Sequence, residues 1–293
     1  MFVSSQAPPN MPERRDPVRP LLGAATCFII YWVVWNLLIP PIRFLGGEMV
    51  ADTIPLLIAA ALASTLGMMI FESRGLGDLG FSWKSGTARN LLTGLAFGAL
   101  GALLLIVPAV LLGVARYQRI EHADVSLPAA LFMPALLFCG AAGEEILFRG
   151  FMLQYLMRGW GPWAGIFTMG ALFGALHSSN PGASPLGMLN TAGFGVLFGI
   201  ALFRSHDLWL PIGMHFAWNT ILPFLGADLS GLTIRVTEYR LVWRGGDLWS
   251  GGKYGPEASV AASAVLLVLF VALWKVPLRK GEAWLLDSPP DSE

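Results

Sequence analysis

Eight apolar segments alternate with polar ones along the chain, and this alternation is its most prominent pattern. Several of the apolar segments reach the ~20 residues that a helix needs to cross the ~30 Å hydrocarbon core of a bilayer. The pattern predicts an all-α, polytopic membrane protein, a helical bundle of about eight transmembrane helices. We place the predicted spans at residues 20–42, 51–71, 90–114, 128–157, 162–180, 185–204, 207–225 and 257–276.

The spans define a transmembrane domain over residues 20–276 with a tail at each end. Residues 1–19 contain four prolines and lack the basic-then-apolar layout of a cleavable leader, which favours a disordered tail. Residues 277–293 form a C-terminal tail. The long loop 226–256 contains a partly alternating stretch, 233–243, which suits a short strand or hairpin at the membrane interface or an irregular chain.

Positive charge favours one orientation of the spans. If both termini face the cytoplasm, eleven Lys and Arg residues fall in inner segments and seven in outer segments. Short cytoplasmic segments carry an excess of Lys and Arg in membrane proteins. We therefore expect both termini on the cytoplasmic side.

Composition agrees with a membrane protein and excludes one class of partner. The chain is 55% hydrophobic and 13% charged, whereas soluble domains are ~25% charged. Nineteen basic residues balance nineteen acidic ones, so we expect no nucleic-acid partner. Cys27 and Cys139 lie in apolar runs, where we expect no disulfide.

Three charged residues interrupt the fourth predicted span, in the sequence EEILFR at 144–149. An ionised side chain at the bilayer centre costs roughly 2.5–3.5 kcal/mol on insertion scales, so we expect this cluster to have a purpose. Glu145 and Arg149 are four residues apart, share a helix face and can form an ion pair. Glu144 points elsewhere without a helical partner, and is the acid left free for general acid–base work.

Two further spans carry polar groups one helical turn apart. Phe173 and His177 lie in the fifth span, and His215 and Asn219 lie in the seventh. His215 and Asn219 could donate two hydrogen bonds to one oxyanion. His177 could hold a water or pass a proton beside Glu144. Together these groups supply a base, a proton carrier and an oxyanion clamp, which peptide-bond hydrolysis needs.

The motifs Glu-Glu-x-x-x-Arg at 144–149, Phe-x-x-x-His at 173–177 and His-x-x-x-Asn at 215–219 follow in this order on separate spans. In this arrangement the chain resembles the CAAX-protease and bacteriocin-processing (CPBP, or Abi) family of multi-span intramembrane endopeptidases. The resemblance covers roughly residues 128–225, the motif core. It implies a hydrolase that cuts a peptide bond in a membrane-anchored peptide or protein tail.

The resemblance also implies a role for each motif residue. Glu144 activates the hydrolytic water together with His177, while His215 and Asn219 stabilise the tetrahedral intermediate. The support residues are Glu145, Arg149 and Phe173. Fifteen Arg against four Lys indicates a GC-rich genome, and we expect a multi-pass protein of a bacterial inner membrane.

A metal-dependent variant of this mechanism is the main chemical alternative. Glu144, His177 and His215 are residue types that ligate zinc. However, the chain has no His-Glu-x-x-His spacing, and Asn219 is a poor zinc ligand. We therefore expect no cofactor; if the activity needs a divalent metal, those three residues are the expected ligands.

Two other functions fit part of the pattern. A proton-coupled transporter or a ligand-binding membrane protein would use the carboxylates to carry protons or a cation. A catalytically silent family member would act as an immunity or scaffold factor. The pair of His215 and Asn219 favours the hydrolase, because an oxyanion clamp has no obvious use in a proton relay. We expect His122 and His206 to be ordinary interfacial residues.

The depth of the site sets a condition on the helix boundaries. At ~1.5 Å per residue, Glu144 lies about 24 Å into the fourth span and His177 about 22 Å into the fifth. Straight antiparallel helices with these ends would leave the two groups at different depths. The hydrolytic interpretation therefore predicts later starts, near Met133 for the fourth span and near Gly165 for the fifth.

Overall fold

The computed structural model describes residues 17–121 and 125–287, so residues 1–16 of the predicted tail and His122 lie outside the described residues. Each predicted span is helical. The corresponding helices are α1 (Val18–Gly46), α2 (Glu48–Glu72), α3 (Thr87–Leu111), α4 (Leu127–Leu147) continued by α5 (Leu153–Trp160), α6 (Pro162–Leu176), α7 (Pro185–Ser205), α8 (Trp209–Phe224) and α10 (Val260–Lys275).

Short elements connect these helices. They are the single turns η1 (Leu76–Asp78), η2 (Phe148–Met152), η3 (His177–Ser179), η4 (Gly252–Tyr254) and η5 (Pro256–Ala258), the strands β1 (Ala115–Arg119) and β2 (Tyr239–Trp243), and the helices α9 (Asp247–Ser250) and α11 (Trp284–Asp287).

Five helical segments of the described chain are long and apolar enough to cross a membrane. They are Val18–Gly46, Glu48–Glu72, Thr87–Leu111, Leu127–Trp160 and Pro185–Ser205. The other predicted spans, α6, α8 and α10, are apolar helices of 15 or 16 residues. The prediction of an all-α membrane helical bundle is confirmed.

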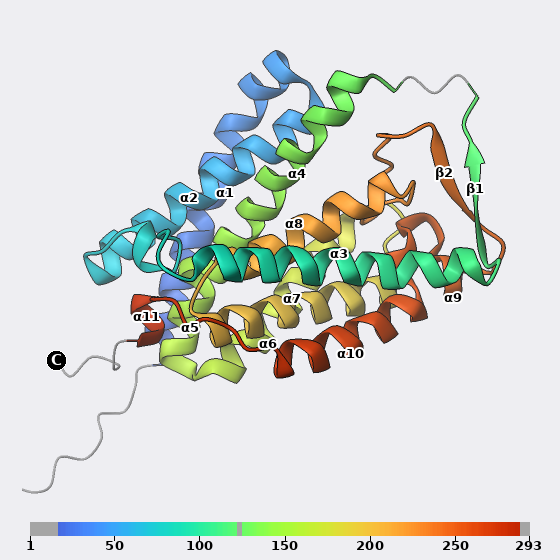
Figure 1. The fold of residues 1–293 in the computed structure, drawn as a ribbon. Helices are drawn as coiled ribbons and strands as arrows, with labels where there is room; N and C mark the ends of the chain where they lie inside the picture. Colours follow the sequence, from blue (N-terminus) through green and yellow to red (C-terminus); the bar gives the residue numbers. More distant parts are fainter. Residues whose placement is uncertain (1–16, 122–124, 288–293) are drawn as a thin grey trace, which may run out of the picture.

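The helices form two groups that differ in direction. Helices α1, α2 and α4 pack together and rise steeply, while α3, α7, α8 and α10 run across the molecule below them (Figure 1). The closest pair is α3 with α8. An added Cβ at Gly94 or Gly98 of α3 would fall on the carbonyl oxygens of Leu210 or Met214. Small residues thus let the two backbones approach closely, as at many helix contacts in membranes.

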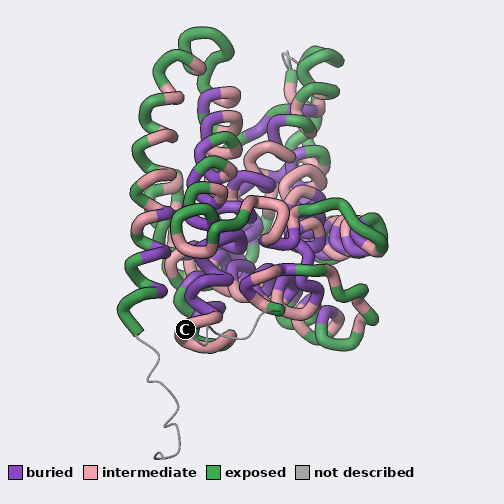
Figure 2. Tube along the Cα trace, turned by 90° about the vertical axis from the view of Figure 1, so that its left-hand side faces the viewer, coloured by how far each residue is buried: buried purple, intermediate pink, exposed green. Residues whose placement is uncertain are grey.

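Burial follows the same division. The interior of the bundle is buried, whereas the outer faces of α1 and α2 and the loops at the ends are exposed (Figure 2). Large apolar side chains such as Leu37, Leu103 and Val268 remain exposed on the outer helices. In a polytopic protein these are the residues that contact lipid.

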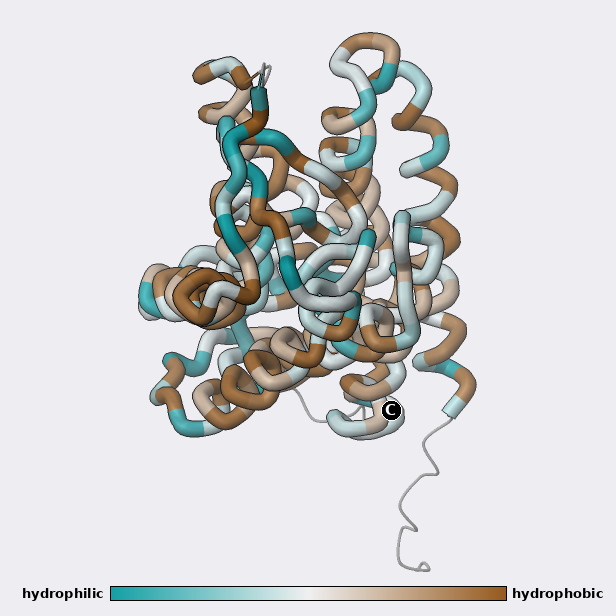
Figure 3. The backbone as a smooth tube through the Cα atoms, turned by 90° about the vertical axis from the view of Figure 1, so that its right-hand side faces the viewer, coloured by the Kyte–Doolittle hydropathy of each residue, from teal (hydrophilic) through white to brown (hydrophobic). Residues whose placement is uncertain are grey.

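The predicted strand in the loop 226–256 exists and has a partner. β2 pairs antiparallel with β1, from Ala115 opposite Trp243 to Arg119 opposite Tyr239. This two-stranded ribbon faces the viewer in Figure 3, and it carries exposed polar residues such as Arg116, Gln118 and Arg240. Of the predicted stretch 233–243, residues 239–243 form this strand, and the carbonyl of Glu238 accepts from the N–H of Ile120.

The predicted shifts of the helix starts are wrong. Helix α4 begins at Leu127, where the Ser126 side chain caps it, and α6 begins at Pro162. The fourth span is a helical stretch of 34 residues that continues to Trp160, so Glu144 lies near its middle. Because α4 crosses the α7–α8 layer at a steep angle, the assumption of antiparallel straight helices fails (Figure 1).

The described part of the C-terminal tail folds back onto the bundle. Leu285 of its helix α11 is buried, and Nδ1 of His206 lies 2.8 Å from Oδ1 of Asp287. His206 is the residue after α7 and is 7% exposed; its expected place at the membrane interface stays a prediction. Cys27 and Cys139 are both free thiols, as expected.

Candidate active site

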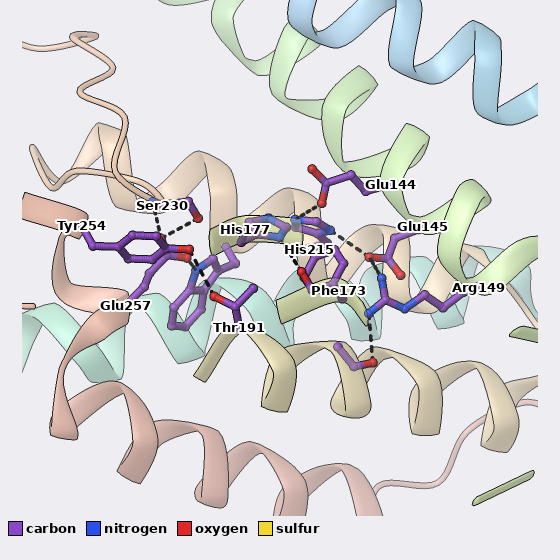
Figure 4. Close-up of polar contacts among 12 residues, drawn as sticks. Glu144, Glu145, Arg149, Phe173, His177, Thr191, His215, Ser230, Tyr254 and Glu257 are labelled. Carbon is purple, nitrogen blue, oxygen red and sulfur yellow. Dashed lines mark hydrogen bonds and ion pairs between the residues drawn. The ribbon is translucent and has the colours of Figure 1, made fainter. Parts of the chain in front are cut away.

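One cavity of about 180 Å³ collects the polar residues of the three sequence motifs. Glu144 reaches it from α4, His177 from the end of α6, and His215 with Asn219 from α8. These four residues span 75 positions of the sequence, and they line one cavity, as the sequence predicts. Figure 4 shows Glu144, His177 and His215 directed toward one another from different helices.

The Glu145–Arg149 pair lies fully inside the bundle. Arg149 Nη1 donates to Glu145 Oε1 over 3.2 Å, and Nη2 donates to the carbonyl of Gly195 on α7 over 2.9 Å. The side chains are 0% and 1% exposed. The predicted ion pair is therefore present, and it also ties α4 to α7.

Aromatic rings surround the guanidinium of Arg149. Its carbon lies 4.6 Å from the ring centre of Phe173, 5.3 Å from that of Phe198 and 5.7 Å from that of Phe148. A cation over aromatic faces in a desolvated site gains up to ~2 kcal/mol. The predicted support residue Phe173 thus contacts the charge of Arg149 as well as the imidazole of His177, 4.6 Å away between ring centres.

His215 stands between the two adjacent glutamates. Its Nδ1 lies 2.8 Å from Glu145 Oε1, and its Nε2 lies 3.8 Å from Glu144 Oε2 (Figure 4). The shorter distance is a hydrogen bond and the longer one is not. Since a carboxylate only accepts, the Nδ1–H of His215 donates to Glu145. Glu145 therefore has a second role that helical spacing alone did not reveal, namely orienting His215.

Glu144 is the accessible acid of the cluster. Its side chain is 26% exposed, compared with 0% for Glu145. Its Oε2 atom is buried and, within the described residues, makes no hydrogen bond. Asp52 of α2, an exposed acid, lines the same cavity.

The backbone around Glu144 is held from both sides. Gly143 packs against the backbone of Leu57 on α2, where an added Cβ would come within 2.9 Å of a nitrogen. After Leu147 the helix widens into η2, and Gly150 leaves helical geometry with ψ at −124°. Ser64 donates to the carbonyl of Ile146 over 3.0 Å, which helps satisfy the backbone at this break.

His177 is fixed at the end of α6. Its Nδ1 lies 2.8 Å from the carbonyl oxygen of Phe173, so Nδ1–H donates and a neutral ring presents Nε2 as an acceptor. The ring is partly exposed and lines the cavity. The Phe-x-x-x-His spacing thus combines an aromatic neighbour with a carbonyl that sets the tautomer.

A further acid, which the motif spacing does not indicate, adjoins the site. Glu257, in η5, is buried and accepts hydrogen bonds from Trp218 Nε1 over 2.8 Å and from the hydroxyl of Ser230 over 2.9 Å. Ser230 lines the 180 Å³ cavity beside His215 and Asn219. The only sequence signal was the position of Glu257 at the start of the last predicted span, which makes it another acid in an apolar setting.

Tyr254 and Thr191 extend this second polar cluster. Their side-chain oxygens lie 3.2 Å apart, and Tyr254 is fully buried. Burial, reinforced by the nearby Glu257, raises the pKa of the Tyr254 phenol. The phenol therefore stays neutral, and the loop is attached to α7 by an uncharged hydrogen bond (Figure 4).

The positions of the donor atoms bear on the metal-dependent alternative. Within residues 17–121 and 125–287, no group of three or more His, Cys, Asp and Glu side chains is arranged to hold a metal ion. Nδ1 of His215 is bonded to Glu145 and Nδ1 of His177 to Phe173, so Nε2 of each ring is the nitrogen that could ligate a metal. Hydrolysis without a metal remains a prediction.

Comparison with known proteins agrees with the resemblance seen in the motifs. A family model described as type II CAAX prenyl endopeptidase Rce1-like matches residues 126–221. No curated protein and no solved structure gives a match. The matched segment begins at the Ser126 cap of α4 and contains every predicted site residue. The matched segment is thus similar to a family of CAAX-type prenyl endopeptidases.

The buried ion pair yields a prediction about folding. Arg149→Ala removes the cation from Glu145 and a donor from Gly195, and breaking a buried pair typically costs 3–5 kcal/mol. We expect a much lower yield of monodisperse protein on gel filtration in detergent. Glu144→Gln, which alters an acid outside this pair, should give the wild-type yield. Equal yields for the two variants would contradict the assignment of Arg149 to support.

Proposed function

We propose that this chain, which matches the Rce1-like endopeptidases over its motif core, is an intramembrane endopeptidase that cuts membrane-anchored peptides or protein tails. In this proposal a water activated by Glu144 attacks the peptide carbonyl. His215 and Asn219 bind the oxygen that becomes negative. Glu145, Arg149 and Phe173 hold these groups in place.

One observation carries the proposal: an accessible carboxylate, two imidazoles and an amide from separate helices line the same small cavity. A general base and an oxyanion clamp are the two parts that acyl transfer needs close together. The cavity is about 180 Å³, which accommodates a peptide group and one water better than a large ligand.

The first step is the formation of the tetrahedral intermediate. Glu144 takes a proton from the water, and the resulting hydroxide forms a bond to the carbonyl carbon. The separation of 3.8 Å between Glu144 Oε2 and His215 Nε2 is too long for a direct bond, and in this proposal one water contacts both groups. His177, with Nε2 as an acceptor, is placed to orient that water.

The oxyanion clamp depends on the protonation of His215. Because Nδ1–H donates to Glu145, a neutral His215 has only a lone pair at Nε2. The ring can donate from Nε2 only as an imidazolium, with Glu145 as its counter-ion. Asn219 donates from its amide one helical turn further along α8.

The second step breaks the C–N bond. The electron pair returns from the oxyanion to the carbonyl, and the leaving nitrogen takes the proton held by Glu144. The products are a carboxylic acid and an amine, and Glu144 is again ionised. One residue thus serves as the base and then as the acid.

The proposed setting is a bilayer, with a membrane-anchored substrate reaching the site. We assign the protein to a bacterial inner membrane with both termini cytoplasmic, on the basis of the Lys and Arg distribution. A proton-coupled transporter is the rival function. His215, which is hydrogen-bonded to Glu145, lies one helical turn from Asn219. This pair favours the protease, because a proton relay needs no amide donor at the position of Asn219.

Glu144→Gln is expected to abolish cleavage. The amide cannot accept the proton of water, and a general base contributes typically 10²–10⁴-fold. The assay uses protein reconstituted in liposomes with a library of lipidated and unlipidated membrane peptides, analysed by mass spectrometry. Glu238→Gln, an exposed acid paired with Arg119 on the ribbon, is the matched control and should cleave normally.

Two outcomes of that assay would overturn the mechanism. One is cleavage that Glu144→Gln leaves unchanged. The other is cleavage that a chelator abolishes and added zinc restores, which would establish a metal-dependent reaction. Proton-driven uptake of a solute without any cleavage would instead support the transporter.

Asn219→Ala tests the oxyanion clamp separately. Removing one oxyanion donor costs about 10²–10³ in kcat. We expect kcat to fall on that scale with little change in KM, because the bond forms in the transition state. Asn36→Ala changes an exposed amide that bonds only to the Trp32 carbonyl, and should leave both constants unchanged. A change in KM alone for Asn219→Ala would place this residue in ground-state binding.

A further inference from the structure

A strand-like segment beside the active site has no backbone partner. Over residues 233–237 burial alternates, with Ile234 and Val236 buried and Thr233 and Arg235 exposed, as in an extended chain with one face on the core. Within residues 17–121 and 125–287, no backbone N–H or C=O group of this segment makes a hydrogen bond. Backbone groups of an extended segment are normally paired.

This segment, residues 233–237, lies between two cavities. Ile234 lines the 180 Å³ active-site cavity together with Leu229 and Leu232. It also lines a second cavity of about 410 Å³, whose lining includes residues 233–237 and β2. The second cavity therefore adjoins the active site at Ile234.

The start of the segment is rigidly anchored. Ser230 has a positive φ of 48°, and its hydroxyl donates to Glu257 over 2.9 Å while its carbonyl accepts from Asn180 over 3.0 Å. The Thr233 hydroxyl donates to Asp228 over 2.7 Å. A non-glycine residue in this conformation costs free energy and persists only where its surroundings fix it. These contacts hold the unpaired segment in place at the mouth of the active site.

We propose that residues 233–237 are the substrate-docking segment, to which an extended polypeptide adds as a β-strand on its way into the active-site cavity. An unpaired extended edge is a template for a further strand, and main-chain hydrogen bonds then provide the affinity. The inference rests on the proposed function, because the occupant is the stretch of substrate next to the scissile bond.

Docking through backbone hydrogen bonds selects the conformation of the substrate and depends little on its sequence. Backbone bonds are the same for every residue except proline, so the recognised feature is an extended, unstructured chain beside a membrane anchor. A folded or helical segment has its backbone groups already paired and cannot add. Side-chain preference is confined to alternate positions, which face the same side as Ile234 and Val236.

Cysteine cross-linking tests the position of the substrate. Arg235→Cys is introduced together with Cys139→Ala and Glu144→Gln, and the protein is reconstituted in phosphatidylethanolamine–phosphatidylglycerol liposomes. The probe is a synthetic peptide that ends in an S-farnesyl cysteine and three apolar residues, with one free cysteine scanned along it. We expect disulfides mainly at alternate peptide positions, several-fold above Arg116→Cys. Arg116 is an exposed arginine of β1 that lines neither cavity and serves as the matched control.

N-methylation of the same peptide tests the backbone bonds. Methylating an amide that pairs with the docking segment should weaken binding to Glu144→Gln about fivefold, the size of one lost hydrogen bond. Methylating the intervening amides should not change the binding, because those amides point away from the docking segment. Uniform effects along the peptide, equal cross-linking of Arg116→Cys, or cross-linking of Arg235→Cys to a second copy of the chain would overturn the proposal.

The two proposals fail in different ways. Binding to Glu144→Gln requires no hydrolysis, and cleavage of the probe by the wild-type protein is scored separately. Cleavage without periodic cross-linking overturns the docking segment and leaves the protease. Periodic cross-linking without cleavage of any peptide supports the docking segment and overturns the protease.

Discussion

The site depends on one buried carboxylate that is shared by two partners. Glu145 Oε1 accepts from Arg149 over 3.2 Å and from the Nδ1 of His215 over 2.8 Å. A buried carboxylate is costly unless its charge is paired and hydrogen-bonded. Both bonds go to Oε1: the arginine supplies the opposite charge and the histidine supplies a second bond, while Oε2 has no partner among the described residues. The hydrogen bond from Nδ1 to Glu145 therefore leaves Nε2 as the ring nitrogen of His215 that faces Glu144.

Three helices are joined through this contact. Arg149 extends it to the backbone of α7, and His215 extends it to α8, where Asn219 follows one turn later. Glu257 makes a parallel connection from the other end of the cavity, through Trp218 and Ser230, to the loop that carries the docking segment. Two buried acids, Glu145 and Glu257, thus adjoin the small cavity, and Glu144 lines it partly exposed.

Periodicity and spacing predicted the helices and the motif residues, because apolar runs and four-residue repeats are local signals. Periodicity and spacing carry no information about contacts between segments that are distant in the sequence. No spacing indicates that Glu145 reaches His215, 70 residues away. The later helix starts near Met133 and Gly165 were wrong, because they assumed straight antiparallel helices, whereas α4 crosses the other layer and extends to Trp160. Glu257 was missed because its partners, Trp218 and Ser230, are not near it in sequence.

The most direct test of the central contact is the protonation of the His215 ring, measured by ¹⁵N NMR on protein labelled at its histidines and reconstituted in bilayers. The chain has only four histidines, and His215→Gln identifies the relevant signals. The account predicts a hydrogen-bonded proton on Nδ1 that shifts strongly in Glu145→Gln. A ring protonated only at Nε2, or a spectrum that Glu145→Gln leaves unchanged, would contradict it.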